Sequence, residues 1–294
     1  MKRRRQVIKS AGRRLTPGAT TVSPALLFMG LFFFIPLVLL LSYSFFGYVG
    51  GEVSFHPTLV NYAKLLGSSF YWGIILRTFL VATVSTAFTV VLGYPVAYQL
   101  ARTRTRMRPL LLLAVVAPLL IGGVVRGYGW ILILDQQGVV NSLLLGLHVV
   151  KNPIHLLFNF TGLVLTMVEV LLPFFILPMM GVIANIDPAV ERAALSVGAS
   201  RLQALFRVTL PLSAHGIAAG ASIVFSLASS IFVIPQIIGG ASYLVLSTLA
   251  YQQIGTVGDW PFGSAISVVM LVITMAVLAV GNVFVARRFK VAGA

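Results

Sequence analysis

Side chains that carry out acid–base, nucleophilic or metal chemistry are scarce in this sequence. Its 294 residues include no cysteine, four histidines and six aspartates and glutamates in total. The lack of cysteine excludes disulfides, thiol catalysis and cysteine-ligated metals. Inside the long apolar stretches only Glu169 and His215 are eligible for an enzymatic centre, and His215 is better explained as a packing residue. The sequence therefore predicts no catalytic residue and no metal site.

Glu169 and Arg126 stand out because each interrupts an apolar stretch. Ionisable groups inside a membrane are costly, and they usually face a pathway or a partner. In one interpretation the two side chains neutralise each other and hold neighbouring helices together. In another, Glu169 lines a pathway for a cationic solute, and Tyr128 and Trp130 supply aromatic faces for cation–π contact. A contact with a second subunit is the third alternative. Counting about 1.5 Å per residue along straight helices places both charges in the outer half of the bilayer.

A second polar group lies in the segment 185–203, between two apolar stretches. Asp187 is suited to cap a helix N-terminus, and Pro188 suits the first helical position. A helix over 189–197 is predicted to follow. Gly198 can adopt the left-handed conformation that ends such a helix.

Ser200 and Gln203 continue this segment with the spacing of a capping box, which predicts the start of another helix. The chain is therefore expected to make a helix, a break and a second helix. Ala193 and Ala194 give the first helix a small, flat face. This face is either an ordinary surface connector or a docking element for a soluble partner.

Membrane-spanning helices must position these residues. The chain is 59% apolar and only 9% charged, with a mean hydropathy of +1.00, whereas soluble domains carry about 25% charged residues. A span needs about 20 apolar residues and must satisfy its own backbone, so the qualifying segments are predicted to be helices. A shorter apolar stretch over 243–254 is predicted to form a helix on the outer surface. The predicted spans are 24–47, 72–100, 110–134, 163–183, 212–237 and 262–284.

Basic residues lie mostly on one side of this six-span arrangement. The formal net charge is +15, and most of the 21 lysines and arginines lie in the two tails and the loops after the second and fourth spans. The positive-inside rule then places both termini in the cytoplasm. The charge indicates attraction to anionic membrane lipid rather than to nucleic acid. The expected organisation is a basic tail over 1–22, a six-helix domain over 23–286 with a cytoplasmic helix at 187–198, and a tail over 287–294.

The cytoplasmic segment resembles the signature loop of binding-protein-dependent ABC importer permeases. That pattern is Glu-Ala-Ala, three residues, Gly, nine residues, an aliphatic residue, any residue, then Leu-Pro. Counted from Gly198, the alanines are Ala193 and Ala194, the aliphatic residue is Val208, and Leu-Pro falls at 210–211.

The first position of the pattern departs from the family, because Arg192 stands there and Glu191 comes one residue earlier. This departure leaves open which acidic contact a partner would meet. The stretch 92–98 resembles the end of the second helix of the family. The stretches that resemble its spermidine/putrescine branch are 125–130, 138–141, 172–178 and 259–261.

The resemblance implies an all-α inner-membrane subunit of a type I ABC importer, with six transmembrane helices. It also implies a second permease subunit, expected to be a different chain, an ABC ATPase dimer and a periplasmic substrate-binding protein. The chain has no Gly-x-x-x-x-Gly-Lys-Ser/Thr loop, the motif that binds phosphate groups of ATP. ATP and Mg are therefore expected on the ATPase. This chain is expected to hold no cofactor and to be a transport subunit rather than an enzyme. The residues to which the resemblance assigns ATPase coupling are Asp187, Glu191, Arg192, Ala193, Ala194, Gly198 and Ser200.

The resemblance also points to a polyamine as the solute. Opine-like or other amino acids, thiamine-like solutes and other cations remain alternatives, as does a stand-alone secondary carrier, although no clear inverted repeat supports a carrier. The candidate pathway residues are Glu169, Arg126, Tyr128 and Trp130. The candidate contacts with the binding protein are Asp135, Asp259 and Trp260, for which solvated acids and an interfacial aromatic belt are the alternative.

Overall fold

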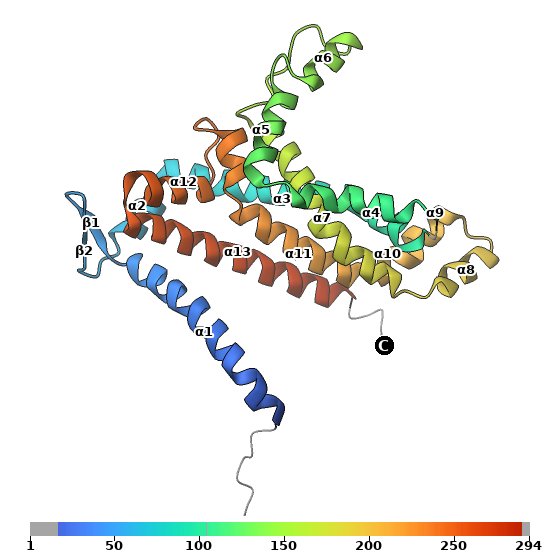
Figure 1. Ribbon diagram of the computed structural model, residues 1–294, viewed down its shortest axis with the longest axis horizontal. Helices are drawn as coiled ribbons and strands as arrows, with labels where there is room; N and C mark the ends of the chain where they lie inside the picture. The colour runs from blue at the N-terminus through green and yellow to red at the C-terminus, as the bar shows by residue number, and fades with distance from the viewer. Residues whose placement is uncertain (1–16, 104, 290–294) are drawn as a thin grey trace, which may run out of the picture.

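The computed structural model describes residues 17–103 and 105–289. Most of the predicted basic N-terminal tail, Arg104 and residues 290–294 lie outside this part of the chain. Apart from the first, the long helices run side by side as a bundle, with the hairpin β1–β2 at one end and α8 at the other (Figure 1). The hairpin is antiparallel, and it pairs Gly47 with Ser54 and Val49 with Glu52.

Four of the described helices are long and apolar enough to cross a membrane. They are α1 (Pro17–Tyr43), α3 (Ser69–Arg102), α7 (Phe160–Ala184) and α13 (Trp260–Phe289). Two bent pairs also qualify, namely Arg108–Leu120 with Gly123–Gly146, bent by 104°, and Arg201–Leu212 with Ala214–Ser230, bent by 70°. The fold has six crossings when each bent pair is counted as one span, in agreement with the predicted all-α six-helix class.

The remaining elements are shorter. They are β1 (Gly47–Val49), β2 (Glu52–Ser54), α2 (Val60–Gly67), α4 (Arg108–Val116), the 3₁₀ turn η1 (Ala117–Leu120), α5 (Gly123–Leu134), α6 (Val139–Gly146), α8 (Pro188–Ser196), α9 (Arg201–Ala204), the π-helical turn η2 (Leu205–Thr209), α10 (Leu210–Leu212), α11 (Ala214–Ser230), the π-helical turn η3 (Pro235–Gly239), α12 (Leu246–Gln252) and the π-helical turn η4 (Gln253–Val257).

The third predicted span is wrong as a single straight helix. Helix α4 tightens into η1, the chain becomes extended at Ile121, and α5 then leaves the bundle and carries α6 outward (Figure 1). Pro118 cannot donate a backbone hydrogen bond, and adjacent glycines at 122–123 weaken helix continuity.

The main core lies where α3, α7 and α11 pack against one another. Phe175 of α7 is fully buried there. A Cβ placed on Gly93 of α3 would come within 2.8 Å of its ring, and one on Gly220 of α11 within 2.9 Å. Glycine at these two positions lets three spans approach closely around one aromatic side chain.

The helix predicted over 243–254 forms as α12, and its apolar side chains are buried in the protein. Leu246 and Leu249 of α12 pack in a second core with Ile74 and Phe262. The backbone N–H of Leu246 donates to the Thr78 hydroxyl of α3 at 2.8 Å. Thr78 thus satisfies one backbone donor at the buried N-terminus of α12.

Two further features differ in extent from the predicted spans. Helix α11 ends at Ser230 and the separate turn η3 begins at Pro235, so the predicted fifth span is interrupted between them. Helix α1 leans away from the bundle (Figure 1), and its most apolar window is 0% buried by the described chain. Its apolar side chains are thus left for lipid or another subunit.

Candidate functional site

Helix α8 forms as its local sequence predicts. The Asp187 carboxylate accepts a hydrogen bond from the backbone N–H of Ala189 at 2.8 Å, and Pro188 begins the helix. Gly198 has a φ of +91°, in the left-handed region that glycine tolerates best. The predicted helix over 189–197 is therefore confirmed to within one residue at each end.

The break after α8 also follows the predicted pattern. Ser200 Oγ accepts from the backbone N–H of Gln203, and the Gln203 side chain accepts from the backbone N–H of Ser200. This capping box starts α9. Arg192 and Ala193 are exposed on α8, whereas Ala194 is half-buried. Helix α8 is thus capped by Asp187 at its N-terminus and followed by the turn at Gly198, and it presents part of its surface outward.

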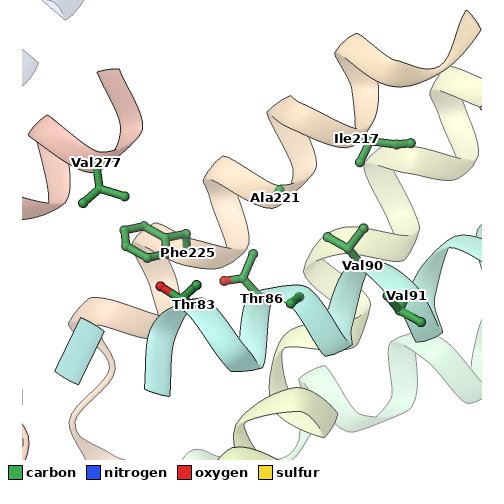
Figure 2. A pocket seen from close by; sticks show the side chains of 9 residues that line it. Thr83, Thr86, Val90, Val91, Ile217, Ala221, Phe225 and Val277 are labelled. Carbon is green, nitrogen blue, oxygen red and sulfur yellow. The ribbon is translucent and has the colours of Figure 1, made fainter. Parts of the chain in front are cut away.

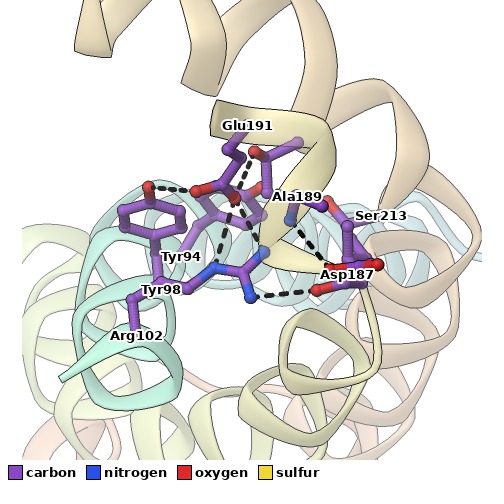
Figure 3. A network of polar contacts seen from close by, with 9 residues as sticks. Tyr94, Tyr98, Arg102, Asp187, Ala189, Glu191 and Ser213 are labelled. Carbon is purple, nitrogen blue, oxygen red and sulfur yellow. Dashed lines mark hydrogen bonds and ion pairs between the residues drawn. The ribbon is translucent and has the colours of Figure 1, made fainter. Parts of the chain in front are cut away.

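Glu191 points the other way, into the protein (Figure 3). Its Oε1 accepts from Arg102 Nη2 at 2.7 Å, from Arg102 Nε at 3.2 Å and from Thr209 Oγ1 at 2.7 Å. Its Oε2 accepts from the Tyr98 hydroxyl at 3.1 Å. The side chains of Glu191 and Arg102 are 14% and 16% exposed. One carboxylate on α8 therefore binds the end of α3 and the turn η2.

The network continues on both sides of this ion pair. Arg102 Nη1 donates to the backbone carbonyl of Ile186, just before α8, at 2.9 Å. One turn above Tyr98, the Tyr94 hydroxyl lies 2.9 Å from the Ser213 hydroxyl at the start of α11. We call Tyr98, Arg102, Glu191 and Thr209 the Glu191 network. It ties α8 to the second and fifth spans.

The pKa of the Glu191 carboxyl reflects opposing effects. Burial acts to raise it, whereas the hydrogen bond from Thr209 and the hydrogen bonds and positive charge of Arg102 act to lower it. The net direction is below the ordinary glutamate value. The carboxylate is therefore ionised at neutral pH and keeps its ion pair with Arg102.

A second carboxylate, Glu169, lies within α7. Its Oε2 accepts from the indole Nε1 of Trp130 on α5 at 3.1 Å. No ion pair joins the described side chains of Glu169 and Arg126, because the Arg126 guanidinium turns to the backbone carbonyl of Pro118. Tyr128 is 61% exposed. Of the four candidate pathway residues, the structure joins only Glu169 and Trp130.

Glu169 and its partner are only partly buried, and two buried polar atoms on α5 and η3 lack a hydrogen-bond partner in the described part of the chain. Glu169 is half-buried, and so is Trp130. Arg126 Nε and Gln236 Oε1 are buried without a hydrogen-bond partner among the described residues. Gln236 belongs to η3, which packs on α5 at Gly127, where a Cβ would come within 2.7 Å of Ile237. Helix α5, which follows the break after α4, thus packs on the turn η3, which follows the end of α11.

The candidate contacts with a binding protein have different environments. Asp135 is exposed at the end of α5. Asp259 is only 8% exposed, and its carboxylate accepts from the backbone N–H of Phe262 at 2.9 Å, so it caps α13. Trp260 is 53% exposed. The surfaces of Asp135 and Trp260 are available to a partner, whereas Asp259 has a structural role.

Sequence reasoning missed the role of Asn141. Its side chain is fully buried, donates to the backbone carbonyls of Asp135 and Ile154 and accepts from the backbone N–H of Ile154 at 2.8 Å. These contacts close the loop that carries α6. A lone asparagine inside an apolar stretch was the signal available for this role.

The described chain also has an open groove of about 480 Å³ between α3, α11 and α13 (Figure 2). Its polar side chains are the hydroxyls of Thr83 and Thr86, and the rest of its lining is apolar. No charged residue lines it, so it suits lipid or an apolar helix better than a cation.

Three comparisons with known proteins agree. The family described as "Binding-protein-dependent transport system inner membrane component" matches residues 89–290. The chain is similar to the spermidine/putrescine transport system permease protein PotB of Salmonella typhi, with 33% identity over 246 residues, 83% of this chain and 85% of the relative. The PotB protein of Escherichia coli is also 33% identical, over 85% of this chain and 91% of the relative.

A solved structure supports the same fold. The structure of a bacterial alginate ABC transporter, in complex with a periplasmic protein that binds an alginate pentasaccharide, contains a chain that superimposes with a TM-score of 0.74. The match covers 92% of this chain and 94% of that chain at 18% identity. At this identity the likeness concerns the fold alone.

Proposed function

Because the chain belongs to the family of binding-protein-dependent transport system inner membrane components, a family of type I ABC importer permeases, we propose that it forms the pathway of an ATP-driven polyamine importer. Members of this family are multi-pass inner-membrane transport subunits rather than enzymes. The finer assignment to a polyamine such as spermidine or putrescine is supported by relatives that carry this name at 33% identity over most of their length.

The observation that carries the polyamine assignment is the contact between Glu169 and Trp130. A half-buried carboxylate within a span is costly unless it has a task. One of its oxygens receives the indole N–H, and the remaining lone pairs can accept hydrogen bonds from an ammonium group. The indole face beside it can stabilise a cation through its π electrons. A solute with several ammonium groups matches both features.

The rest of the assembly follows from the proposed function. A second, different permease subunit would complete the pathway, and an ABC ATPase dimer with ATP and Mg would dock on the α8 end. A periplasmic binding protein would deliver the solute at the opposite end, near Asp135 and Trp260. This arrangement requires both termini in the cytoplasm, as the distribution of basic residues predicts.

The test is uptake by the complete importer, reconstituted in proteoliposomes with its ATPase, second permease and binding protein. We expect ATP-dependent uptake of labelled spermidine or putrescine. Replacing Glu169→Gln, which keeps the shape and removes the charge, should lower uptake about tenfold or more, as expected for a lost charge contact inside a membrane. The replacement Glu52→Gln, in the exposed hairpin, is the matched control and should leave uptake unchanged.

Two results would contradict this proposal. Uptake of an uncharged or anionic solute in preference to polyamines would overturn the substrate class. Equal uptake by the Glu169→Gln and wild-type importers would remove Glu169 from the pathway. A thermal-shift screen of solutes on the binding protein gives an independent reading of the substrate, because that screen does not depend on the permease.

A further inference from the structure

Two neighbouring charges on α8 have opposite environments. Glu191 is held inside by the Glu191 network, with its negative charge paired to Arg102. Arg192 is exposed, and no hydrogen bond or ion pair with a described residue engages it. Successive residues on a helix point about 100° apart, so the Glu191 side chain can face the protein while the Arg192 side chain faces outward. The charge that α8 offers to a partner is therefore positive.

The surroundings of Arg192 reinforce this sign. Arg106, Arg201 and Arg207 are exposed at the same end of the described chain. Asp187 is the exposed acid nearest to them in sequence, and its carboxylate already caps the N-terminus of α8. The α8 end of the described protein thus presents a positive surface. Complementary potential favours a partner surface that carries acidic groups.

Two exposed apolar side chains accompany Arg192, one on α8 and one at its C-terminal end. Leu195 is 41% exposed and Val197 is 84% exposed. Exposed apolar residues gathered around a charge are typical of a protein interface rather than of a solvated surface. We call Arg192, Ala193, Leu195 and Val197 the docking surface of α8.

On the premise of the proposed function, we propose that the ATPase groove that receives α8 carries a carboxylate opposite Arg192. A guanidinium and a carboxylate form a planar, bidentate contact. This contact would replace the one expected from a glutamate at this position, which the family pattern places there and this chain lacks. The permease would thereby select an ATPase whose groove is acidic and disfavour one whose groove is basic.

A charge series at position 192 tests this inference in the complete importer. The importer is purified in nanodiscs, and the amount of ATPase that stays bound to the permease is measured at several salt concentrations. The ATPase is identified by the mass of its phosphate-binding-loop peptide. We expect Arg192→Lys to retain the ATPase, Arg192→Gln to weaken it, and Arg192→Glu to weaken it at least about tenfold, with the largest loss at low salt. Arg201→Glu makes the same change in net charge on the same positive surface but outside α8, so it should have a smaller effect if the contact at Arg192 is local.

The outcomes separate the possibilities. If Arg192→Glu retains the ATPase as well as the wild type, or better, the groove is basic or neutral and the inference is overturned. If Arg201→Glu weakens retention equally, the effect is one of overall charge and the local contact is overturned. If the wild-type chain copurifies with no ATPase, the proposed function itself fails.

A direct contact measurement supports the charge series. The chain contains no cysteine, so Ala193→Cys introduces a unique thiol beside Arg192. A photo-activated cross-linker on that thiol should attach to an ATPase peptide that contains an aspartate or glutamate. A cross-link confined to peptides without an acidic residue would count against the proposal, whatever the retention data show.

Discussion

The two inward-facing glutamates of this protein are held in different ways. Glu191 accepts four hydrogen bonds from three side chains and pairs with a guanidinium. Glu169 accepts one, from Trp130, and Arg126, the one cation of α5, turns to the backbone carbonyl of Pro118. The carboxylate at the α8 end is satisfied by the protein itself, whereas the carboxylate in the membrane is satisfied only in part.

We propose that this difference distinguishes a structural charge, Glu191, from a binding charge, Glu169. A fully satisfied polar network in a low-dielectric setting rigidifies the elements that it joins. A carboxylate with unused lone pairs gains by meeting a ligand, and a membrane interior offers little water to compete. Glu191 therefore joins α8 firmly to two spans, and Glu169 is available to a cation. The predictions below test each half of this comparison.

The largest effect is expected from Arg102→Ala. This change leaves the Glu191 carboxylate without its counter-ion, although Thr209 and Tyr98 still donate to it. Removing one member of a largely buried pair costs about 3–5 kcal/mol, and the partial exposure of this pair reduces the cost to about 2–3 kcal/mol. The measurement is the thermal unfolding midpoint in nanodiscs, together with transport per ATP hydrolysed.

The double variant Arg102→Met with Glu191→Met is the control for this prediction. It removes both charges and keeps apolar volume, so stability should recover well above that of Arg102→Ala. Transport per ATP should stay low, because the link between α8 and α3 is still lost. Full recovery of coupling in the double variant would show that Glu191 is not a mechanical connection.

The next effect is expected from Gly198→Val. A Cβ at this position meets nothing within 4 Å, so the cost is purely conformational. A β-branched residue with a φ of +91° costs about 1–2 kcal/mol. The end of α8 should shift, and solute uptake should fall while ATP hydrolysis and expression persist. Gly198→Asn is the control, because asparagine tolerates the left-handed region; unchanged uptake by the valine variant would count against a coupling role for α8.

Local chemistry explains what could be predicted from the sequence about α8. An aspartate cap, a proline at the first position and a glycine at the stop lie within about twelve residues of one another, and each acts through neighbouring backbone atoms. The capping box at Ser200 is local in the same way. These features need no knowledge of tertiary structure.

The roles of Glu191 and Arg126 were not accessible in this way. Arg102 is 89 residues from Glu191 in the chain, and no periodicity in the sequence indicates that they meet. The expectation that Arg126 and Glu169 face each other assumed a straight third span. The break at 121–122 redirects α5 and presents Trp130 instead. Contacts between distant residues depend on helix packing and bends, which composition and spacing do not specify.

A smaller effect is expected from pH. The pKa of the Glu191 carboxyl lies below its ordinary value of 4.5, so the ionised form is favoured in the folded protein. The Glu191 network therefore contributes its full stability above about pH 4.5, and this contribution is lost as the pH falls through the lowered pKa. The unfolding midpoint of the wild type should fall over that acidic window more steeply than that of Glu191→Gln. Parallel curves for the two proteins would show that Glu191 does not gain its stability from ionisation.

The smallest effect is expected from Trp130→Phe, which sharpens the comparison most directly. The change keeps an aromatic ring beside Glu169 and removes only its N–H donor. If Glu169 is a binding charge, the free energy of unfolding should fall by only about 1 kcal/mol or less, because a single hydrogen bond to the carboxylate is lost. The KM for polyamine uptake should rise about two- to threefold at constant kcat, because the carboxylate is oriented less well. A loss of stability as large as that of Arg102→Ala would instead make Glu169 a structural charge like Glu191. The distinction between the two glutamates would then fail.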